Sequence, residues 1–112
     1  MKKIRSLTFL SLLIFLSTPV FAGNDCGTEN AHVTRIYPWE SGVTFIELDK
    51  PNNCGCKESN RFGFTRDDQF AKTYLAQALT AFATNSNITI YGKAGCKVHD
   101  DSPFVYTVII SK

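Results

Sequence analysis

The sequence predicts a mainly β domain of the α+β type with a single α-helix, and three observations lead to that class. Apolar residues recur at helical spacing between Phe70 and Phe82, which is typical of a helix with one buried side. Short runs rich in β-branched and aromatic residues, bounded by Gly, Pro and Asn, precede and follow this segment. Four cysteines in a short chain indicate a small domain stabilised by disulfide bonds.

Residues 1–22 have the three parts of a signal peptide. Basic residues open the chain, residues 7–16 are predominantly apolar, and residues 20–22 end in the small-residue pattern that signal peptidase cleaves. A membrane anchor is the alternative, but polar residues and a proline interrupt the apolar run and no stop-transfer flank follows it. We therefore expect cleavage after residue 22 and a secreted or periplasmic protein without a membrane span.

Cleavage changes the charge that matters for binding partners. Lys2, Lys3 and Arg5 are three of the 12 basic residues, so the mature chain keeps nine against ten acidic residues, a net charge of about −1. A near-neutral chain without a cluster of Lys and Arg disfavours nucleic acid as a partner. The remaining residues, 23–112, suffice for a single domain.

The four cysteines, Cys26, Cys54, Cys56 and Cys96, are an even set in a chain that carries an export signal, which predicts two disulfide bonds. A bond between Cys54 and Cys56 would close a very small, strained ring. We therefore expect one of these two residues to pair with Cys96 and the other with Cys26, and the sequence leaves open which. Such bonds matter because a domain of this size has a small core.

A zinc site is the alternative use of these residues. Cys54 and Cys56 could be joined as ligands by Cys96 and His99, which are separated by two residues. This arrangement leaves Cys26 unused, so two disulfides are the more economical interpretation. We expect no metal ion and no other cofactor, and interpret His99 and His32 as solvated residues.

The helix is predicted over about residues 66–84. Asp67 and Asp68 suit its first turn, Thr65 is a candidate N-cap, and the polar segment 85–87 predicts its end. Six residues lie on one stripe of the helical repeat and are expected to face the core: Phe70, Tyr74, Leu75, Ala78, Leu79 and Phe82.

Five strands are predicted, at residues 32–37, 43–49, 61–64, 87–91 and 104–110. The first two form an antiparallel hairpin because the connection at 38–42 is too short for any other pairing. The order β-β-β-α-β-β predicts a five-stranded Greek-key barrel of the OB type, with the helix across one end. A sandwich with the helix on one face of a sheet is the alternative.

Taken together, several segments resemble a widespread family of small exported bacterial proteins and, more distantly, the B subunits of subtilase cytotoxin and related AB5 toxins. They are a signal peptide, Thr-Arg-Ile at 34–36, Gly-Val-x-Phe-Ile-Glu-Leu at 42–48, the cysteine loop, the helix at 74–84, Ile-Thr-Ile-Tyr-Gly at 88–92 and a Cys before the last strand. The resemblance is strongest over residues 70–91. It implies an OB barrel, a disulfide-bonded exported module and a pentameric ring that binds glycans, and it assigns no particular site residue.

Catalysis is not predicted. The sequence contains no Gly-x-Ser-x-Gly, His-Glu-x-x-His or phosphate-loop motif, and the cysteines are better used as disulfides. The acidic pairs Asp67–Asp68 and Asp100–Asp101 are interpreted as solvated charges or helix caps. We therefore expect a non-catalytic binding module with a glycan or protein ligand. A small hydrolase or enzyme inhibitor that acts on the cell envelope is the alternative.

The candidate binding residues are Tyr37, Trp39 and Glu40, at the turn of the first hairpin. An aromatic side chain at such a turn can serve as an exposed platform that stacks on a sugar or inserts into a partner. The alternative is that Trp39 folds back onto the domain as a small hydrophobic lid.

Overall fold

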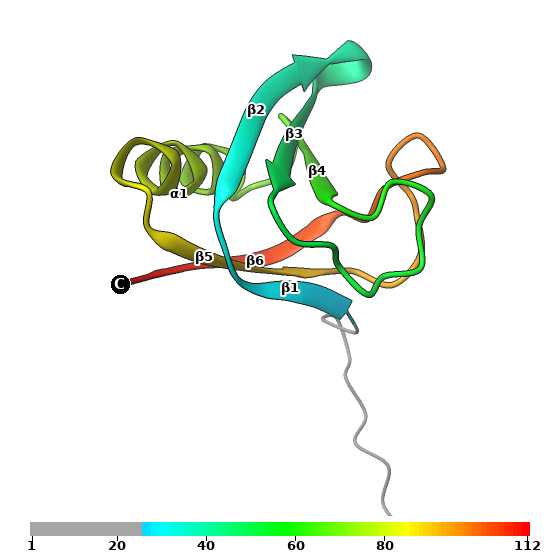
Figure 1. The fold of residues 1–112 in the computed structure, drawn as a ribbon. Coiled ribbons are helices and arrows are strands. Elements are labelled where there is room, and N and C mark those ends of the chain that lie inside the picture. Colours follow the sequence, from blue (N-terminus) through cyan, green and yellow to red (C-terminus); the bar gives the residue numbers. More distant parts are fainter. Residues whose placement is uncertain (1–25) are drawn as a thin grey trace, which may run out of the picture.

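The computed structural model describes residues 26–112 (Figure 1), so the predicted signal peptide and its cleavage site lie outside the described residues. The described part is mainly β, with two three-stranded antiparallel sheets and one long helix. One sheet has the strand order β1-β5-β6 and the other has the order β2-β3-β4. The elements are β1 (Cys26–Ala31), β2 (Val33–Trp39), the short 3₁₀ turn η1 (Glu40–Gly42), β3 (Val43–Leu48), β4 (Arg61–Thr65), α1 (Ala71–Thr84), β5 (Asn87–Gly92) and β6 (Val105–Ser111).

The described residues form six strands, whereas the sequence predicted five strands in a closed barrel. The additional strand is β1, whose Gly and Asn residues have low β propensity and gave no signal. Asn30 lies at an irregularity in the pairing of β1 with β5 and has a φ of 52°. Only His32 separates β1 from β2, so one nearly continuous segment contributes to both sheets. On the other side, a single parallel bridge between Gly63 and Phe104 connects the sheets, and the barrel is not closed.

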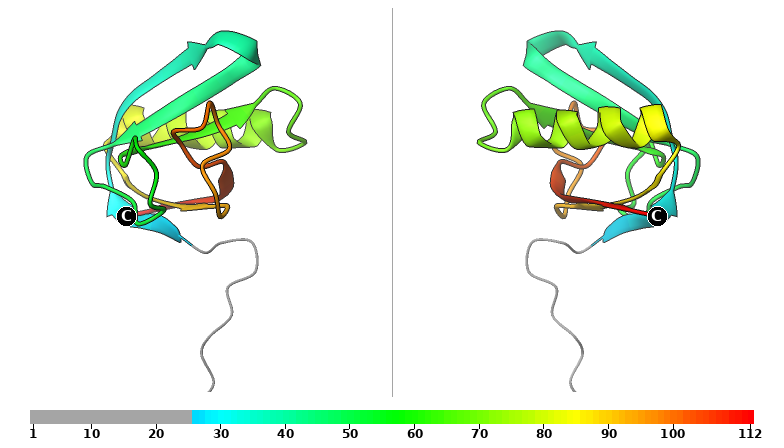
Figure 2. Two further views of the ribbon diagram at one scale, coloured as in Figure 1. Left: turned by 90° about the vertical axis from the view of Figure 1, so that its right-hand side faces the viewer. Right: turned by 90° about the vertical axis from the view of Figure 1, so that its left-hand side faces the viewer.

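The core lies between the two sheets and α1. Figure 2 shows α1 along one side of the molecule, between the β2–β3 hairpin and the strands β5 and β6. Successive side chains along a strand point to opposite faces of the sheet, so every second one faces this core. The cross-strand neighbours Ile36, Ile46 and Phe62 are an example. The buried core residues are Ala31, Val33, Ile46, Leu48, Phe62, Phe64, Tyr74, Ala78, Ala81, Ile88, Ile90, Val105 and Val108.

Helix α1 begins later than predicted and ends as predicted. A turn precedes it, in which the Asp68 carboxylate accepts a hydrogen bond from the Phe70 backbone N–H at 2.8 Å, so Asp68 does not enter the helix. Thr65 is not the N-cap, because the helix starts after Phe70 and no side chain caps it. At the other end Asn85 adopts the left-handed conformation with a φ of 53°, and its N–H bonds to the carbonyl of Ala81.

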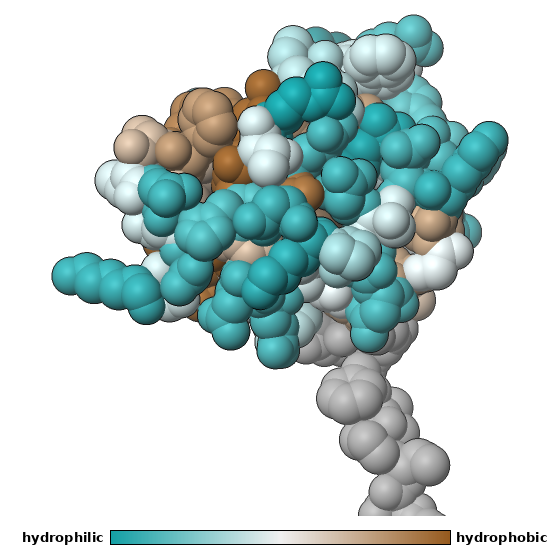
Figure 3. Space-filling view, viewed as in Figure 1, coloured by the Kyte–Doolittle hydropathy of each residue, from teal (hydrophilic) through white to brown (hydrophobic). Residues whose placement is uncertain are grey.

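Of the six residues on the predicted apolar stripe, only Tyr74 and Ala78 are buried. Tyr74, Ala78 and Ala81 face the core, whereas Leu79 and Phe82 are 49% and 53% exposed. The small side chains of Ala78 and Ala81 allow α1 to lie close to the sheets, and the contact is narrower than the stripe. Its outward flank therefore remains in solvent: Figure 3 shows brown apolar surface on the side where Figure 1 places α1. The exposed members of the predicted stripe are Phe70, Leu75, Leu79 and Phe82.

Two disulfide bonds are present, as predicted, and no cysteine of the described residues is free. Cys26 pairs with Cys54 at a Cα–Cα distance of 4.9 Å, and Cys56 pairs with Cys96 at 5.5 Å. The first bond ties β1 to loop 49–60, and the second ties this loop to loop 93–104. Gly92 leaves room for the first bond, since a Cβ there would lie 3.3 Å from each of its sulfur atoms. Within residues 26–112, no helix has the length and apolar character needed to cross a membrane.

Candidate functional site

The predicted binding residues belong to a larger surface, which we call the outer face: the side of β2-β3-β4 that points away from the main core. Cross-strand pairing arranges this face in three rows. The rows are Arg35–Glu47–Arg61, Tyr37–Phe45–Gly63 and Trp39–Val43–Thr65.

The aromatic part of the outer face centres on Phe45, which is fully buried. The Tyr37 ring lies 5.6 Å from the Phe45 ring, centroid to centroid, and the Trp39 ring lies 6.5 Å from it. Tyr37 and Trp39 contact each other edge to face at 6.3 Å. Trp39 is nevertheless 54% exposed, so much of its indole is accessible. Glu40 is exposed in η1 beside it and forms no ion pair with the described residues.

Two residues of the charged row, Arg35 and Glu47, form an ion pair. Arg35 donates two parallel hydrogen bonds to the Glu47 carboxylate, at 3.0 and 2.9 Å, and the Tyr37 hydroxyl donates a third at 2.7 Å. The hydrogen bond from Arg35 is the main cause that lowers the pKa of Glu47, and the bond from Tyr37 adds to it. Burial, followed by the hydrogen bond to Glu47, raises the pKa of Tyr37. Glu47 is thus a paired carboxylate at neutral pH.

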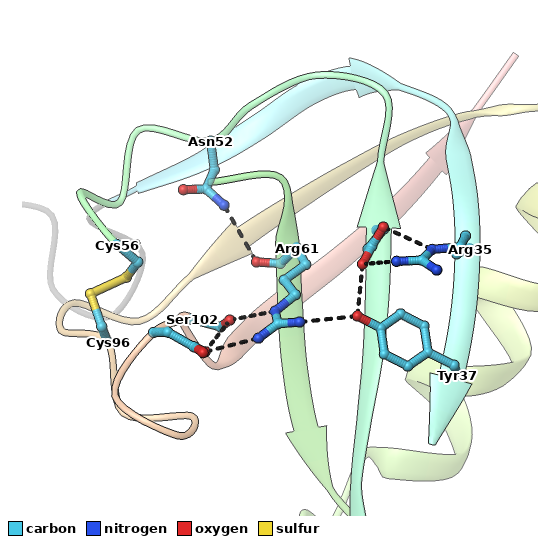
Figure 4. Close-up of polar contacts among 9 residues, drawn as sticks. Arg35, Tyr37, Asn52, Cys56, Arg61, Cys96 and Ser102 are labelled. Atoms are coloured by element: carbon cyan, nitrogen blue, oxygen red, sulfur yellow. Dashed lines mark hydrogen bonds and ion pairs between the residues drawn. A yellow bond between two sulfur atoms is a disulfide. The ribbon is translucent and has the colours of Figure 1, made fainter. Parts of the chain in front are cut away.

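Arg61 connects the outer face to loop 93–104 (Figure 4). It donates hydrogen bonds to the Ser102 hydroxyl at 2.8 Å, to the Tyr37 hydroxyl at 3.1 Å and to the Asp101 carboxylate at 3.0 Å. Its guanidinium lies over the Phe45 ring at 4.0 Å from the centroid. With 16% of its side chain exposed and each of its three nitrogens engaged in one hydrogen bond, Arg61 holds its neighbours in position.

Loop 93–104 covers the β4 side of the outer face. Val98 packs so closely on Gly63 that a Cβ at Gly63 would lie 3.0 Å from it. Val98 and Ser102 then pair through two backbone hydrogen bonds of 2.9 and 3.1 Å, which close a tight turn over residues 98–102. His99 lies in this turn, with its ring 6.3 Å from the Phe45 ring.

Several predicted residues have other roles. The zinc alternative is wrong for Cys56 and Cys96, which form a disulfide, and residues 26–112 contain no group of three or more His, Cys, Asp or Glu side chains that could hold a metal ion. The sequence predicts a solvated Asp101, whereas in the structure Asp101 pairs with Arg61 in a partly buried position. Burial alone would raise the pKa of Asp101, yet the hydrogen bonds from Ser102 and Arg61 lower it.

Tyr37 and Trp39 of the outer face are predicted from the sequence as binding residues, whereas Arg35, Glu47 and Arg61 are not. The sequence does indicate that Arg35 lies on the same face as Tyr37 and Trp39, because the three residues are spaced by two along one strand. The register that sets Glu47 between two arginines is not visible in the sequence.

Two grooves border α1, and the first of them shares Arg35 and Tyr37 with the outer face. A groove of about 340 Å³ between β2 and α1 is lined by Thr34, Arg35, Ile36, Tyr37, Leu79 and Phe82. A second groove, of about 370 Å³, is lined by Asp68, Gln69, Phe70, Tyr74, Lys93 and Tyr106.

No family model, curated protein or solved structure matches the chain. The candidate site is therefore interpreted from its geometry.

Proposed function

We propose that the mature chain is an exported, non-catalytic binding module of the OB type that recognises a glycan on its outer face. The arrangement of strands supports the OB type: β1 and β2 serve both sheets as one segment, the Gly63–Phe104 bridge relates β4 to the segment before β6, and α1 lies between β4 and β5. Proteins of this type bind oligosaccharides and oligonucleotides on the corresponding strand face and the adjoining loops. Here the adjoining segments are η1 and loop 93–104.

The half-exposed indole of Trp39, next to Tyr37, is the observation on which the choice of ligand rests. A flat aromatic surface binds the apolar face of a sugar ring, and the neighbouring polar side chains can bind its hydroxyl groups. A nucleic acid would instead require unpaired cations. Arg35 and Arg61 are each paired with an acidic residue, so they offer little attraction to phosphate groups.

Trp39 also provides the test, because it is the only tryptophan of the chain and its fluorescence reports on the outer face directly. The oxidised mature protein is screened on a printed glycan array, and the best ligand is titrated against wild type and Trp39→Ala. We expect Trp39→Ala to weaken binding by about 2 kcal/mol, about 30-fold in Kd, with little change in Tm. For the variant, calorimetry replaces fluorescence.

Phe70→Ala is the matched control, since Phe70 is equally exposed but lies near α1, away from the outer face. It should leave the affinity unchanged. An array without a ligand, or a Trp39→Ala variant that is destabilised but binds as wild type does, would contradict the proposed function. The second result would identify Trp39 as a hydrophobic lid.

We further propose that several copies of the chain assemble, with a ring of five as the form that the resemblance implies. The exposed flank of α1 and the groove between α1 and the edge strand β2 support this, because such surfaces are commonly covered in assemblies. Phe82→Glu should then lower the mass measured by sedimentation, whereas Thr80→Glu on another side of α1 should not. A wild-type protein that stays monomeric at high concentration would contradict assembly.

A further inference from the structure

The turn over residues 98–102 holds two consecutive residues in an unfavourable backbone conformation. His99 has a φ of 51° and Asp100 a φ of 61°, and both belong to the left-handed region. Residues other than glycine occupy this region at a conformational cost, since their Cβ approaches the neighbouring carbonyl, and His and Asp are among those that tolerate it best. A turn of this kind persists only where the surrounding structure fixes it, and such turns are concentrated at functional sites.

The surroundings of this turn fix it from several directions. Arg61 binds Asp101 and Ser102 at 3.0 and 2.8 Å, and Val98 is buried beside Phe45 and Gly63. The disulfide of Cys96 anchors the same loop to loop 49–60, two residues before Val98. These contacts compensate for the conformational cost at His99 and Asp100.

The fixed turn brings His99 to the aromatic part of the outer face. Trp39 reaches Phe45 from β2, on one flank of β3, whereas loop 93–104 arrives over Gly63 of β4, on the other flank. The His99 ring lies 6.3 Å from the Phe45 ring, and the Trp39 ring lies 6.5 Å from it. Both side chains are exposed, so they border the same surface from opposite sides.

The turn next to Trp39 also contains a residue other than glycine with a positive φ. Ser41 in η1 has a φ of 65°, and Gly42 follows with a φ of 74°. The two turns that border the outer face thus both hold a residue other than glycine in the left-handed region. Both Ser41 and His99 are exposed, although the His99 ring also lies near the buried Phe45 ring.

We propose that His99 is a ligand-contacting residue of the outer face, held by its strained turn opposite Trp39. The indole binds the apolar side of a sugar ring, and the imidazole, a donor and an acceptor in its neutral form, binds the hydroxyl groups at the rim. This inference rests on the proposed glycan function and adds a second wall to the site.

The test separates strain from binding. His99→Gly removes the imidazole and also removes the conformational cost, because glycine adopts the left-handed conformation freely. His99→Asn removes the imidazole but keeps a side chain that tolerates this conformation. We expect both variants to retain or raise the Tm and to weaken binding of the best array glycan at least tenfold, measured through Trp39 fluorescence. Asn85→Gly is the matched control: Asn85 has a φ of 53° at the end of α1, so relief of strain there should leave the affinity unchanged.

Each other outcome overturns the proposal in a recognisable way. Unchanged affinity in His99→Gly, together with a Trp39-dependent ligand, removes His99 from the site and leaves the glycan function standing. A lowered Tm in both His99 variants shows that the imidazole serves the fold. An array on which wild type binds nothing overturns this inference and the proposed function together.

Discussion

Arg61 is the residue whose side chain joins the outer face to loop 93–104. It joins β4 to Tyr37 of β2 and to Asp101 and Ser102 of loop 93–104, and it covers Phe45. The planar guanidinium suits this role because its donors are fixed in direction. An ammonium group could replace the charge of Arg61 but could not supply the same set of bonds.

Arg61→Ala should therefore destabilise the domain by about 2 kcal/mol, because it leaves partly buried polar groups without partners. Urea unfolding of the oxidised protein measures the change. Arg61→Lys should recover little of the loss. Arg66→Ala is the control, since Arg66 is exposed and takes part in no ion pair within residues 26–112, and its effect should stay below about 0.5 kcal/mol. Equal effects of Arg61→Ala and Arg66→Ala would show that the contacts of Arg61 contribute nothing net.

The lowered pKa of Glu47 predicts how the free energy of unfolding depends on pH. Its pKa in the folded protein is lowered below the ordinary value of 4.5, chiefly by the hydrogen bond from Arg35, so the folded state binds the proton more weakly than the unfolded state. The contribution of Glu47 is thus complete above pH 4.5 and is lost as the pH falls through the lower folded value. Urea titrations from pH 7 to pH 3 should show stability falling in this acidic range. Glu47→Gln should be less stable at pH 7 and show a shallower fall, and a profile identical to that of wild type would refute the assignment.

At the scale of the element, α1 shows that a helical pattern of apolar residues does not by itself predict which of those residues are buried. Leu79 and Ala78 are neighbours on the predicted stripe, and the sequence predicts that both face the core. In the structure Ala78 is buried and Leu79 is 49% exposed. The difference arises because the side of α1 that faces the core carries Tyr74, Ala78 and Ala81, whereas Leu79 lies beside the groove toward β2.

A pair of aspartate substitutions in α1 tests this difference. Ala78→Asp should cost about 3 kcal/mol or more, because it places an unpaired charge in the core. Leu79→Asp should cost no more than about 1 kcal/mol, mostly through lower helix propensity. Circular dichroism during urea unfolding, at a concentration low enough to exclude assembly, measures both. If Leu79→Asp unfolds the domain, the outward flank of α1 is wrongly placed.

At the scale of the whole molecule, the two disulfides compensate for a small core. They join β1 to loop 49–60 and this loop to loop 93–104, so the segments around the cysteine-rich side are connected covalently. Loop 93–104 also holds the turn of His99. The stability of the fold and the geometry of the candidate site therefore depend on the same bonds.

Replacing Cys56 and Cys96 together by Ser should lower the stability by about 4 kcal/mol, as the chain-entropy description gives for a bond between residues 40 apart. The remaining bond between Cys26 and Cys54 should keep part of the fold. Thiol titration of denatured, unreduced wild type should find no reactive group. Detection of two or more thiols would show that a bond does not form, and an unchanged unfolding midpoint in the double variant would show that it contributes nothing.

The sequence alone determined the type of the domain and several of its parts. Periodicity of 3.6 and of 2 located the helix, its end and the main strands, since these patterns are local consequences of backbone geometry. The number of cysteines predicted two disulfides, and the position of Trp39 after a Pro predicted an aromatic residue beside the hairpin turn. β1 was not predicted because its composition lacks residues with high β propensity, and its strand conformation is imposed by pairing with β5.

The tertiary structure decided what depends on contacts between distant residues. It determines which cysteines pair with Cys54 and Cys56, which side of α1 is buried and how many strands form. It set the register that places Glu47 between Arg35 and Arg61, and it brought His99 to Phe45 from more than fifty residues away in the sequence. None of these has a local signature, because each is fixed by the packing of segments whose own patterns are compatible with several arrangements.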